Sequence, residues 1–241
     1  MSALAVEAIT SRHGLLTAVH GVSLTIEPGE VLAVVGANGA GKTTLFRTIA
    51  GLHRPAEGAV FLGGIDITDV PAYGRPHLGL SMVPEGRRLF TNMTVRENIQ
   101  IACEQTGRSR KTFGAVLDAL PVVRTLLGKP AGGLSGGQRQ AVAIARALVT
   151  APRVLLLDEV SLGLSPAAID TVYETLAALK LGGEAAMVVV EQDLDRAMGF
   201  CDRLVCMLEG KIVLEGKPKD LTREEVSQAY FGLHKGSNAH A

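Results

Sequence analysis

The sequence predicts an α/β fold with a parallel sheet flanked by helices, an antiparallel β-subdomain at the N-terminus and an inserted helical subdomain. Three observations support this class. Short alternating segments open the chain, apolar segments then alternate with helical ones, and one internal stretch is helical without strands. The 241 residues are enough for one large domain with subdomains.

The N-terminal segments predict strands of a partly antiparallel layer. Alternating patterns cover residues 4–9, 21–26 and 59–62. A Pro-Gly pair at 28–29 and a Gly-Gly pair at 63–64 provide turns after two of them.

The following segments predict a parallel sheet, because apolar strands alternate with helical patterns. We expect strands over residues 31–35, 80–83, 154–157, 186–190 and 204–208. We expect helices over residues 44–50, 138–149, 166–179 and 194–200.

The stretch 94–127 differs, since residues 95–103 and 111–120 have helical spacing and no strand lies between them. The predicted division is a core over 1–93 and 134–232 that includes the antiparallel β-subdomain, an inserted helical subdomain over 94–133, and a small, polar tail over 233–241 that is expected to fray.

Charge and hydropathy argue against several classes of function. The 24 basic and 24 acidic residues cancel, so no overall charge favours nucleic acid. No apolar run approaches the ~20 residues that span a bilayer, and the N-terminus lacks a signal-peptide pattern, so we expect membrane association only through a partner. Cys103, Cys201 and Cys206 are expected to be reduced thiols. Cys201 and Cys206 resemble a metal-binding pair, but a metal site requires a second Cys or His pair, and none accompanies them.

Residues 36–43, Gly-Ala-Asn-Gly-Ala-Gly-Lys-Thr, spell a phosphate-binding loop between an apolar strand and a helix. Its glycines let backbone N–H groups turn inward onto a polyphosphate, and the helix adds its positive N-terminal end. Lys42 is expected to reach the β and γ phosphates, and the Thr43 hydroxyl to complete a Mg²⁺ shell. This setting makes a chance glycine-rich turn a poor explanation, so we expect the chain to bind a nucleotide.

Two acids, Asp158 and Glu159, follow the apolar strand at 153–157. The end of a parallel strand faces the ligand crevice, so these acids are expected beside the phosphates. Asp158 would hold Mg²⁺ through water, and Glu159 would orient and polarise the attacking water. The alternative is a pair of acids that only solvates the strand end.

A second glycine-rich element, Leu-Ser-Gly-Gly-Gln at residues 134–138, also opens a helix. A helix start of this kind is a second anion site, although a glycine turn capped by Ser135 is locally plausible. One nucleotide needs one cradle, and only the first element has a Lys-Thr pair. The second element is therefore expected to serve a nucleotide that another chain binds.

In this order and spacing, residues 36–43, 134–138 and 155–159 resemble the motifs of the ATP-binding subunit of an ABC transporter. The resemblance covers nearly the whole chain and implies a P-loop ATPase core. Further segments make the chain similar to the branched-chain amino acid importer group, and within it to the shorter of two ATPase subunits; these segments are 83–90, 161–166 and 190–192.

The resemblance implies ATP and Mg²⁺ as cofactors and a head-to-tail dimer that sandwiches two ATP molecules. The implied partners are an identical chain or a second ABC ATPase subunit, two membrane permease subunits, and indirectly a periplasmic or lipid-anchored substrate-binding protein, with no nucleic acid. The implied location is peripheral, at the cytoplasmic face of the inner membrane.

The resemblance also implies roles for individual residues. The implied catalytic residues are Glu159, Gln192 and Glu85, and the implied metal-binding residues are Thr43, Glu85 and Asp158. The implied nucleotide-binding residues are His13, Val19, Gly36, Ala37, Asn38, Gly39, Ala40, Gly41, Lys42, Thr43, Thr44, Ser135, Gly136, Gly137 and Gln138.

Four positions depart from the common family pattern. Glu85 stands where most members have Gln, and Gln192 where most have a switch histidine; both departures are similar to the importer group. Gln192 can hydrogen-bond a phosphate but cannot become cationic. His13 replaces the usual Tyr and offers less area for stacking on adenine, and Val160 replaces a common Pro.

Two other classes of function remain open from the sequence. One is an ABC-type ATPase that acts on the ribosome or DNA, although the chain has one motif set and no sustained heptads. The other is a subunit that closes on ATP but hydrolyses it poorly beside a more active partner. The transported solute and the choice between homodimer and heterodimer cannot be predicted from these residues.

Overall fold

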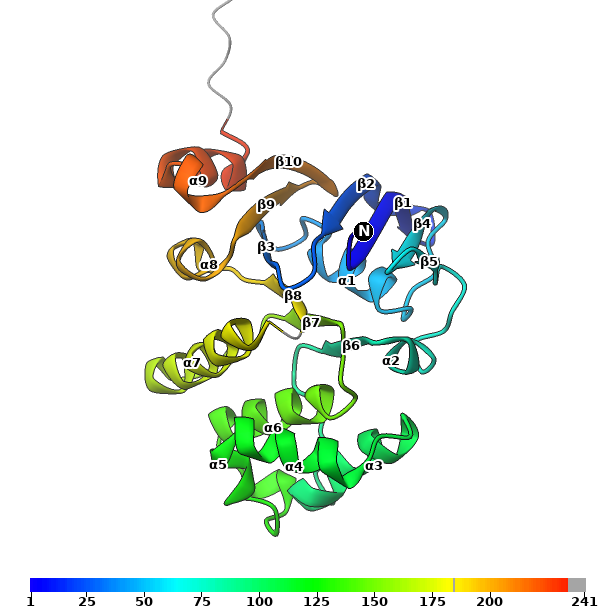
Figure 1. Cartoon of the computed structure of the whole chain (residues 1–241). Coiled ribbons are helices and arrows are strands. Elements are labelled where there is room, and N and C mark those ends of the chain that lie inside the picture. The colour runs from blue at the N-terminus through cyan, green and yellow to red at the C-terminus, as the bar shows by residue number, and fades with distance from the viewer. Residues whose placement is uncertain (184, 234–241) are drawn as a thin grey trace, which may run out of the picture.

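The computed structural model describes residues 1–183 and 185–233, which form two sheets with helices around them (Figure 1). Residues 234–241 of the predicted tail at 233–241 lie outside the described residues. Among the residues that are described, no helix has the length and apolar character needed to cross a membrane.

The smaller sheet is antiparallel and has the strand order β2-β1-β4-β5. Its strands are β1 (Leu4–His13), β2 (Leu16–Ile26), β4 (Glu57–Leu62) and β5 (Ile65–Asp66). In β1 the inward side chains alternate up to Val6, and a register shift lets Ile9 return to the core. The predicted antiparallel layer is confirmed.

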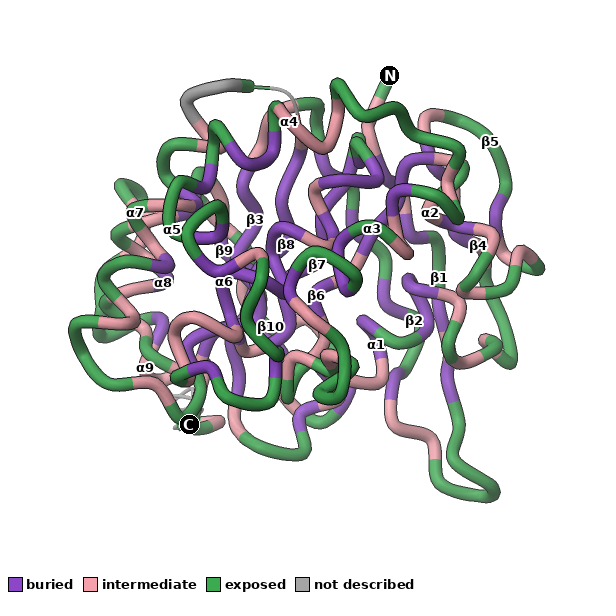
Figure 2. The backbone as a smooth tube through the Cα atoms, turned by 90° about the horizontal axis from the view of Figure 1, so that it is seen from below, coloured by how far each residue is buried: buried purple, intermediate pink, exposed green. Residues whose placement is uncertain are grey.

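The larger sheet has six strands in the order β10-β9-β3-β8-β7-β6. Its strands are β3 (Val31–Val35), β6 (Leu80–Val83), β7 (Val154–Asp158), β8 (Ala186–Val190), β9 (Arg203–Leu208) and β10 (Lys211–Gly216). The first five pair in parallel, and β10 pairs antiparallel with β9 at the edge. Every residue of β3, β7 and β8 is buried, as expected of parallel strands covered on both faces (Figure 2).

Two hydrophobic clusters cover the two faces of this sheet. Successive residues of β3 alternate between them: Leu32 and Val34 face α1 (Lys42–Ile49) and the antiparallel sheet, whereas Val31, Ala33 and Val35 face the opposite cluster. The opposite face is covered by α6 (Gly136–Leu148), α7 (Pro166–Gly182), α8 (Leu194–Phe200) and α9 (Arg223–Phe231). The described chain thus forms a layered α/β fold, and the predicted fold class is confirmed.

Helices without strands connect β6 to β7. They are α3 (Val95–Gln105), α4 (Arg110–Ala119), α5 (Pro121–Arg124) and a 3₁₀ turn at Ala131–Gly133. Thr94 begins α3 with a capping box, and Ser109 caps α4. These helices pack on α6, which also contacts β6 and α7 (Figure 1). Because α6 contacts both groups, the predicted boundaries at 93/94 and 133/134 stay predictions.

Candidate functional site

The loop between β3 and α1 has a backbone that only glycine can adopt without strain. Gly36, Gly39 and Gly41 have φ angles of 150°, 84° and 96°. A Cβ at Gly36 would lie 2.3 Å from the carbonyl oxygen of Met207, and one at Gly41 would lie 2.4 Å from that of Ala18. The loop therefore lies tightly between β2 and β9, and neither Gly36 nor Gly41 can be replaced without moving these strands, whereas Gly39 is required only for its backbone conformation.

Helix α1 begins without a side-chain cap. Gly41 is its N-cap residue and offers no side chain to the first N–H groups, which have no acceptor inside the helix. The Lys42 ammonium donates to the carbonyl oxygens of Gly36 at 2.6 Å and Ala37 at 3.0 Å. Burial lowers the pKa of Lys42, and the nearby Glu159 carboxylate opposes this shift. Free N–H groups and a buried cation together suit a polyphosphate.

A cavity of about 250 Å³ lies over this loop, and Glu159 lines it. Residues from the loop and the start of α1 form the rest of the lining, together with Ala18; they are Asn38, Gly39, Gly41, Lys42, Thr43 and Thr44. Glu159 has a φ of +48°, a left-handed conformation that costs about 1 kcal/mol or more for a non-glycine residue. The turn after β7 therefore directs a carboxylate toward the phosphate loop at a cost in backbone strain.

Asp158, the last residue of β7, is buried beside Glu159, with 2% of its surface exposed. Its Oδ1 atom has no hydrogen-bond partner among the described residues. Burial, and then the Glu159 and Glu85 carboxylates, raise the pKa of Asp158 to about 6. A buried carboxylate oxygen without a partner fits a cation, so the residues present suit the predicted Mg²⁺.

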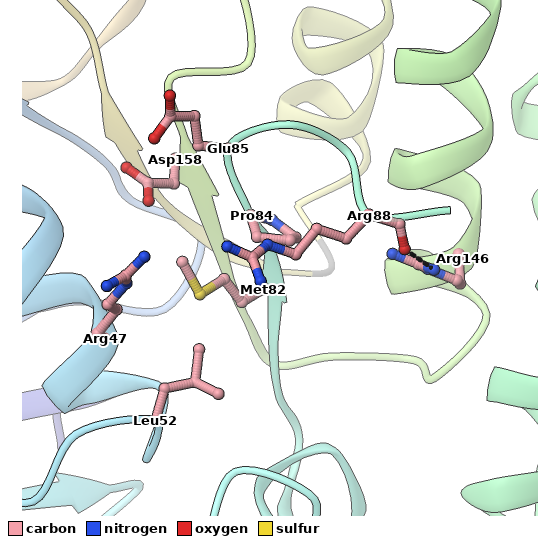
Figure 3. Close-up of a pocket in the computed structure, with 8 residues that line it drawn as sticks. All are labelled: Arg47, Leu52, Met82, Pro84, Glu85, Arg88, Arg146 and Asp158. Atoms are coloured by element: carbon pink, nitrogen blue, oxygen red, sulfur yellow. Dashed lines mark hydrogen bonds between the residues drawn. The ribbon is translucent and has the colours of Figure 1, made fainter. Parts of the chain in front are cut away.

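Glu85 follows β6 and lines a second cavity, of about 540 Å³, together with Asp158 (Figure 3). The two carboxylates lie side by side, and Arg47 of α1 lies on the other side of Asp158. The next three residues, at 86–88, all have positive φ angles. Arg146 of α6 stabilises this strained turn by donating to two of its carbonyl oxygens, one of them at Arg88.

Gln192 follows β8 and reaches the phosphate loop, where its amide donates to Asn38 Oδ1 at 3.4 Å. His13 lies at the end of β1 with Nε2 3.1 Å from the Thr44 hydroxyl. Its ring is backed by His53, with ring centroids 4.8 Å apart. Val19, which was also predicted to bind the nucleotide, is fully buried next to Gly41 and exposes no surface to a ligand.

The second glycine-rich element begins α6 with a capping box. Gln138 N–H donates to the Ser135 hydroxyl at 3.3 Å, and Ser135 N–H donates to the Gln138 side chain at 3.0 Å. Ser135, Gly137 and Gln138 line a cavity of about 280 Å³ between α5, α6 and α7 that includes no phosphate-loop residue. A Cβ at Gly137 would lie 2.9 Å from that of Ala168 on α7. The structure thus brings Glu159 and Gln192 to the phosphate loop and Asp158 near its Lys42. Glu85 lies beside Asp158 in the second cavity, and residues 135–138 line a separate cavity.

A model of the ABC transporter family matches residues 19–161, which is more than half of the chain and includes the phosphate loop, the second glycine-rich element and both acids. The chain belongs to the ABC transporter family. The chain is therefore an ATP-binding ATPase, and the geometry above is that of a family member.

Individual family members match over most of their length. The high-affinity branched-chain amino acid transport ATP-binding protein BraG of Pseudomonas aeruginosa is 34% identical over 95% of this chain and 99% of that protein. The probable branched-chain amino acid transport ATP-binding protein LivF of Archaeoglobus fulgidus is 35% identical over 85% of this chain and 87% of that protein. The crystal structure of the ADP conformation of MJ1267, an ATP-binding cassette of an ABC transporter, has a TM-score of 0.85 and 30% identity, and the match covers 96% of this chain and 99% of that one.

Sequence reasoning missed several residues of this ABC ATPase site. Arg146 supports the turn after Glu85 from a distant helix, His53 backs His13, and Glu191 connects segments 30 residues apart. No local pattern marks Arg146 or His53, because their contacts form only in the folded chain. Glu191 stands beside Gln192 in segment 190–192, which the resemblance had already singled out.

Proposed function

We propose that this chain is the ATP-hydrolysing subunit of an importer for branched-chain or related amino acids and that it works as a head-to-tail dimer. One observation carries the proposal: two glycine-rich helix starts line different cavities, and only one has a Lys-Thr pair. The second has a use if it faces the nucleotide of a partner. The names of the BraG and LivF relatives support the choice of cargo.

The phosphate loop binds the ATP of its own chain in this proposal. The free N–H groups at the start of α1 face the phosphates, and Lys42 exchanges its two carbonyl acceptors for phosphate oxygens. His13 stacks on adenine, with its ring held by Thr44 and His53. The loop thus positions the substrate before the dimer closes.

The Thr43 hydroxyl and the Asp158 and Glu85 carboxylates hold Mg²⁺ in this proposal. Asp158 is the best supported of the three, because its buried Oδ1 has no other partner among the described residues. When bound, the ion neutralises the charge that develops on the phosphates.

Hydrolysis depends on two side chains that the fold directs at the loop. Glu159 polarises the attacking water and accepts its proton, while the water oxygen forms a bond to the γ phosphorus and the bond from that phosphorus to the ADP oxygen breaks. The proton then leaves with the released phosphate. Gln192 hydrogen-bonds the γ phosphate, and the Ser135 hydroxyl of the partner donates to it from the other side. Release of ADP and phosphate removes these contacts, so the dimer reopens.

The cavity beside Glu85 is where the permeases receive this motion in our proposal. It lies at the junction of α1, the strained turn after β6 and α6, so closure of the dimer changes its shape. The complete importer contains two permease subunits and an external binding protein, with the ATPase chains peripheral at the cytoplasmic face of the inner membrane. The partner chain is either identical or a second ABC ATPase subunit.

The test is reconstitution with the permeases into vesicles. Wild-type complex is expected to hydrolyse ATP and to accumulate labelled leucine only when ATP is on the side of this chain. Glu159→Gln in this chain is expected to bind ATP with unchanged affinity, to stay dimeric in ATP and to lose uptake. ATP hydrolysis without uptake of any branched-chain or related amino acid would refute the cargo, and normal turnover in the variant would refute the role of Glu159.

A further inference from the structure

Glu191 is a buried carboxylate that the mechanism above does not use. It lies between the last residue of β8 and Gln192, with 3% of its surface exposed. Its oxygens accept hydrogen bonds from the Ser161 hydroxyl at 2.8 and 3.1 Å and from the Tyr173 hydroxyl of α7 at 2.5 Å. The carboxylate therefore meets two other segments of the chain at short range.

The same carboxylate also accepts from the loop that carries Gln192. The backbone N–H groups of Gln192 and Asp193 donate to Glu191 Oε1 at 2.9 and 3.2 Å. Arg196 of α8 lies 3.5 Å from this oxygen and 3.3 Å from Asp193, so it divides its charge between them. A buried carboxylate is costly unless its oxygens are satisfied, and here the donors come from three separate segments.

Tyr173 contributes the shortest of these bonds. Burial and the neighbouring Glu191 carboxylate raise the pKa of Tyr173, so its hydroxyl keeps its proton and donates. The Arg196 guanidinium lies over the same ring, 5.5 Å from its centre. These contacts fix the position of Glu191 from the side of α7 and α8.

The segments joined by Glu191 both lead to the ATPase site. Ser161 lies two residues after Glu159, whose strained backbone starts the same turn. Gln192 reaches Asn38 of the phosphate loop. We propose that Glu191 is a positioning residue of the ATPase site, which holds the Gln192 loop and the turn after Glu159 in one fixed relation. This inference rests on the proposed function.

The test compares two variants, Ser161→Ala and Glu191→Gln, with a matched control variant, all in the full-length protein. Ser161→Ala removes the bond to the turn after Glu159, and Glu191→Gln keeps the size of the side chain but removes its charge. We expect both to lower kcat about tenfold, because small misplacements of reacting groups slow catalysis strongly, and to leave KM for ATP within about twofold. Equal losses in kcat and affinity would not fit a positioning role.

Glu30→Gln is the matched control. Glu30 lies just before β3, at the end of the sheet opposite the phosphate loop, and it also pairs with an arginine, Arg203 at 2.7 Å, and accepts a backbone N–H. Its loss is expected to lower the melting temperature and to leave kcat unchanged. If Ser161→Ala and Glu191→Gln behave like this control, Glu191 has only a structural role and the inference is wrong.

A double-mutant cycle adds a readout that stability does not move. Ser161 and Gln192 are joined through Glu191, so Ser161→Ala is expected to cost little further kcat in a Gln192→Ala background. Fully multiplied losses would overturn the inference. The proposed function can fail independently of this inference. It fails if the wild-type protein has no ATPase activity or if Glu159→Gln keeps normal activity. If Glu159→Gln is inactive but Glu191→Gln has a normal kcat, only the positioning role of Glu191 is refuted.

Discussion

The two glycine-rich helix starts of this chain differ in how their N–H groups are satisfied. Helix α1 follows Gly41, an N-cap residue without a side chain, and its first residue is the buried Lys42. Helix α6 follows Ser135, which forms a capping box: its hydroxyl accepts from Gln138 N–H, and its own N–H donates to the Gln138 side chain. The first start is open to an anion, whereas the second satisfies itself when the chain is alone.

The difference shows that two glycine-rich segments can begin helices that interact with a phosphate in different ways. In α1 the glycines leave donors free, so the loop is prepared to bind phosphate in a single chain. In α6 the Ser135 oxygen accepts a backbone N–H, and its own proton remains available as a donor. A capped start of this kind contributes one hydroxyl to a phosphate already bound elsewhere, which suits a partner's nucleotide.

Removing the lysine beside the uncapped start of α1 is expected to have the largest effect on ATP binding. Lys42→Ala is expected to weaken ATP binding about a hundredfold, since hydrogen bonds to charged groups contribute ~1.5–3 kcal/mol. Titration calorimetry with the full chain measures the change. Lys211→Ala on the edge strand β10 is the control for loss of one positive charge, and equal losses in both variants would reduce the effect to net charge.

Changing the capped start should spare binding and remove turnover. Ser135→Asp keeps a side chain that caps α6 but places a carboxylate against the partner's phosphate. ATP affinity is expected to stay within about twofold, while kcat falls on the order of tenfold to a hundredfold. Thr222→Asp at the capping box of α9 is the matched control and is expected to leave kcat unchanged. A loss of ATP binding in Ser135→Asp would contradict the division of roles.

Asp158, which lies near Lys42 of the phosphate loop, is expected to make stability and Mg²⁺-dependent ATP binding depend on pH. Its folded-state pKa of about 6 lies above its ordinary value of 3.8, so the nucleotide-free chain loses stability as pH rises from about 4 through 6. Asp158→Asn is expected to stabilise the nucleotide-free chain at pH 8 by about 3 kcal/mol and to give no gain near pH 4. In wild type, Mg²⁺-dependent ATP affinity is expected to fall below pH 6, where the carboxyl is protonated. Urea titrations at both pH values and binding with and without Mg²⁺ measure these effects.

His13 is expected to give the smallest effect. His13→Tyr enlarges the stacking surface and is expected to raise ATP affinity about threefold, within the ~0.5–1.5 kcal/mol of an aromatic pair. Binding of ATP and of inorganic triphosphate separates the base from the phosphates, because only ATP should gain. An equal gain for triphosphate would place the effect outside the base site.

The strands of the larger sheet, except β10, were predictable from the sequence to within a residue, whereas β1 and β2 of the smaller sheet are longer than predicted. Residues 31–35, 80–83 and 186–190 are apolar runs bounded by polar or turn residues, and the structure confirms their limits. Strand β10 was missed because its side chains are half exposed and its neighbour is antiparallel. The four-residue helices α2 (Arg75–Leu78) and α5 are too short for a periodic pattern, and α9 has a weak one.

The site was predictable where one short motif carries the chemistry. The phosphate loop and Glu159, the residue after β7, line one cavity, in keeping with parallel-strand geometry. Three properties could be recognised only in the folded structure. They are the raised pKa of Asp158, the capping box at the start of α6, and the hydrogen bonds to Glu191. Burial and contacts between distant segments determine all three, so no local pattern reports them. The roles assigned to individual site residues stay predictions until the variants are measured.

Mixing two impaired variants tests the central claim most directly. Lys42→Ala removes the lysine of the phosphate loop and Ser135→Asp removes the Ser135 hydroxyl, so each variant alone is expected to keep only a small residual ATPase activity. If each site combines the two starts from different chains, a mixed dimer has one intact site, and an equal mixture regains about a quarter of wild-type ATPase activity by random pairing. If the mixture only shows the sum of its two parents under conditions where wild type dimerises and hydrolyses ATP, each site lies within one chain and the account is wrong.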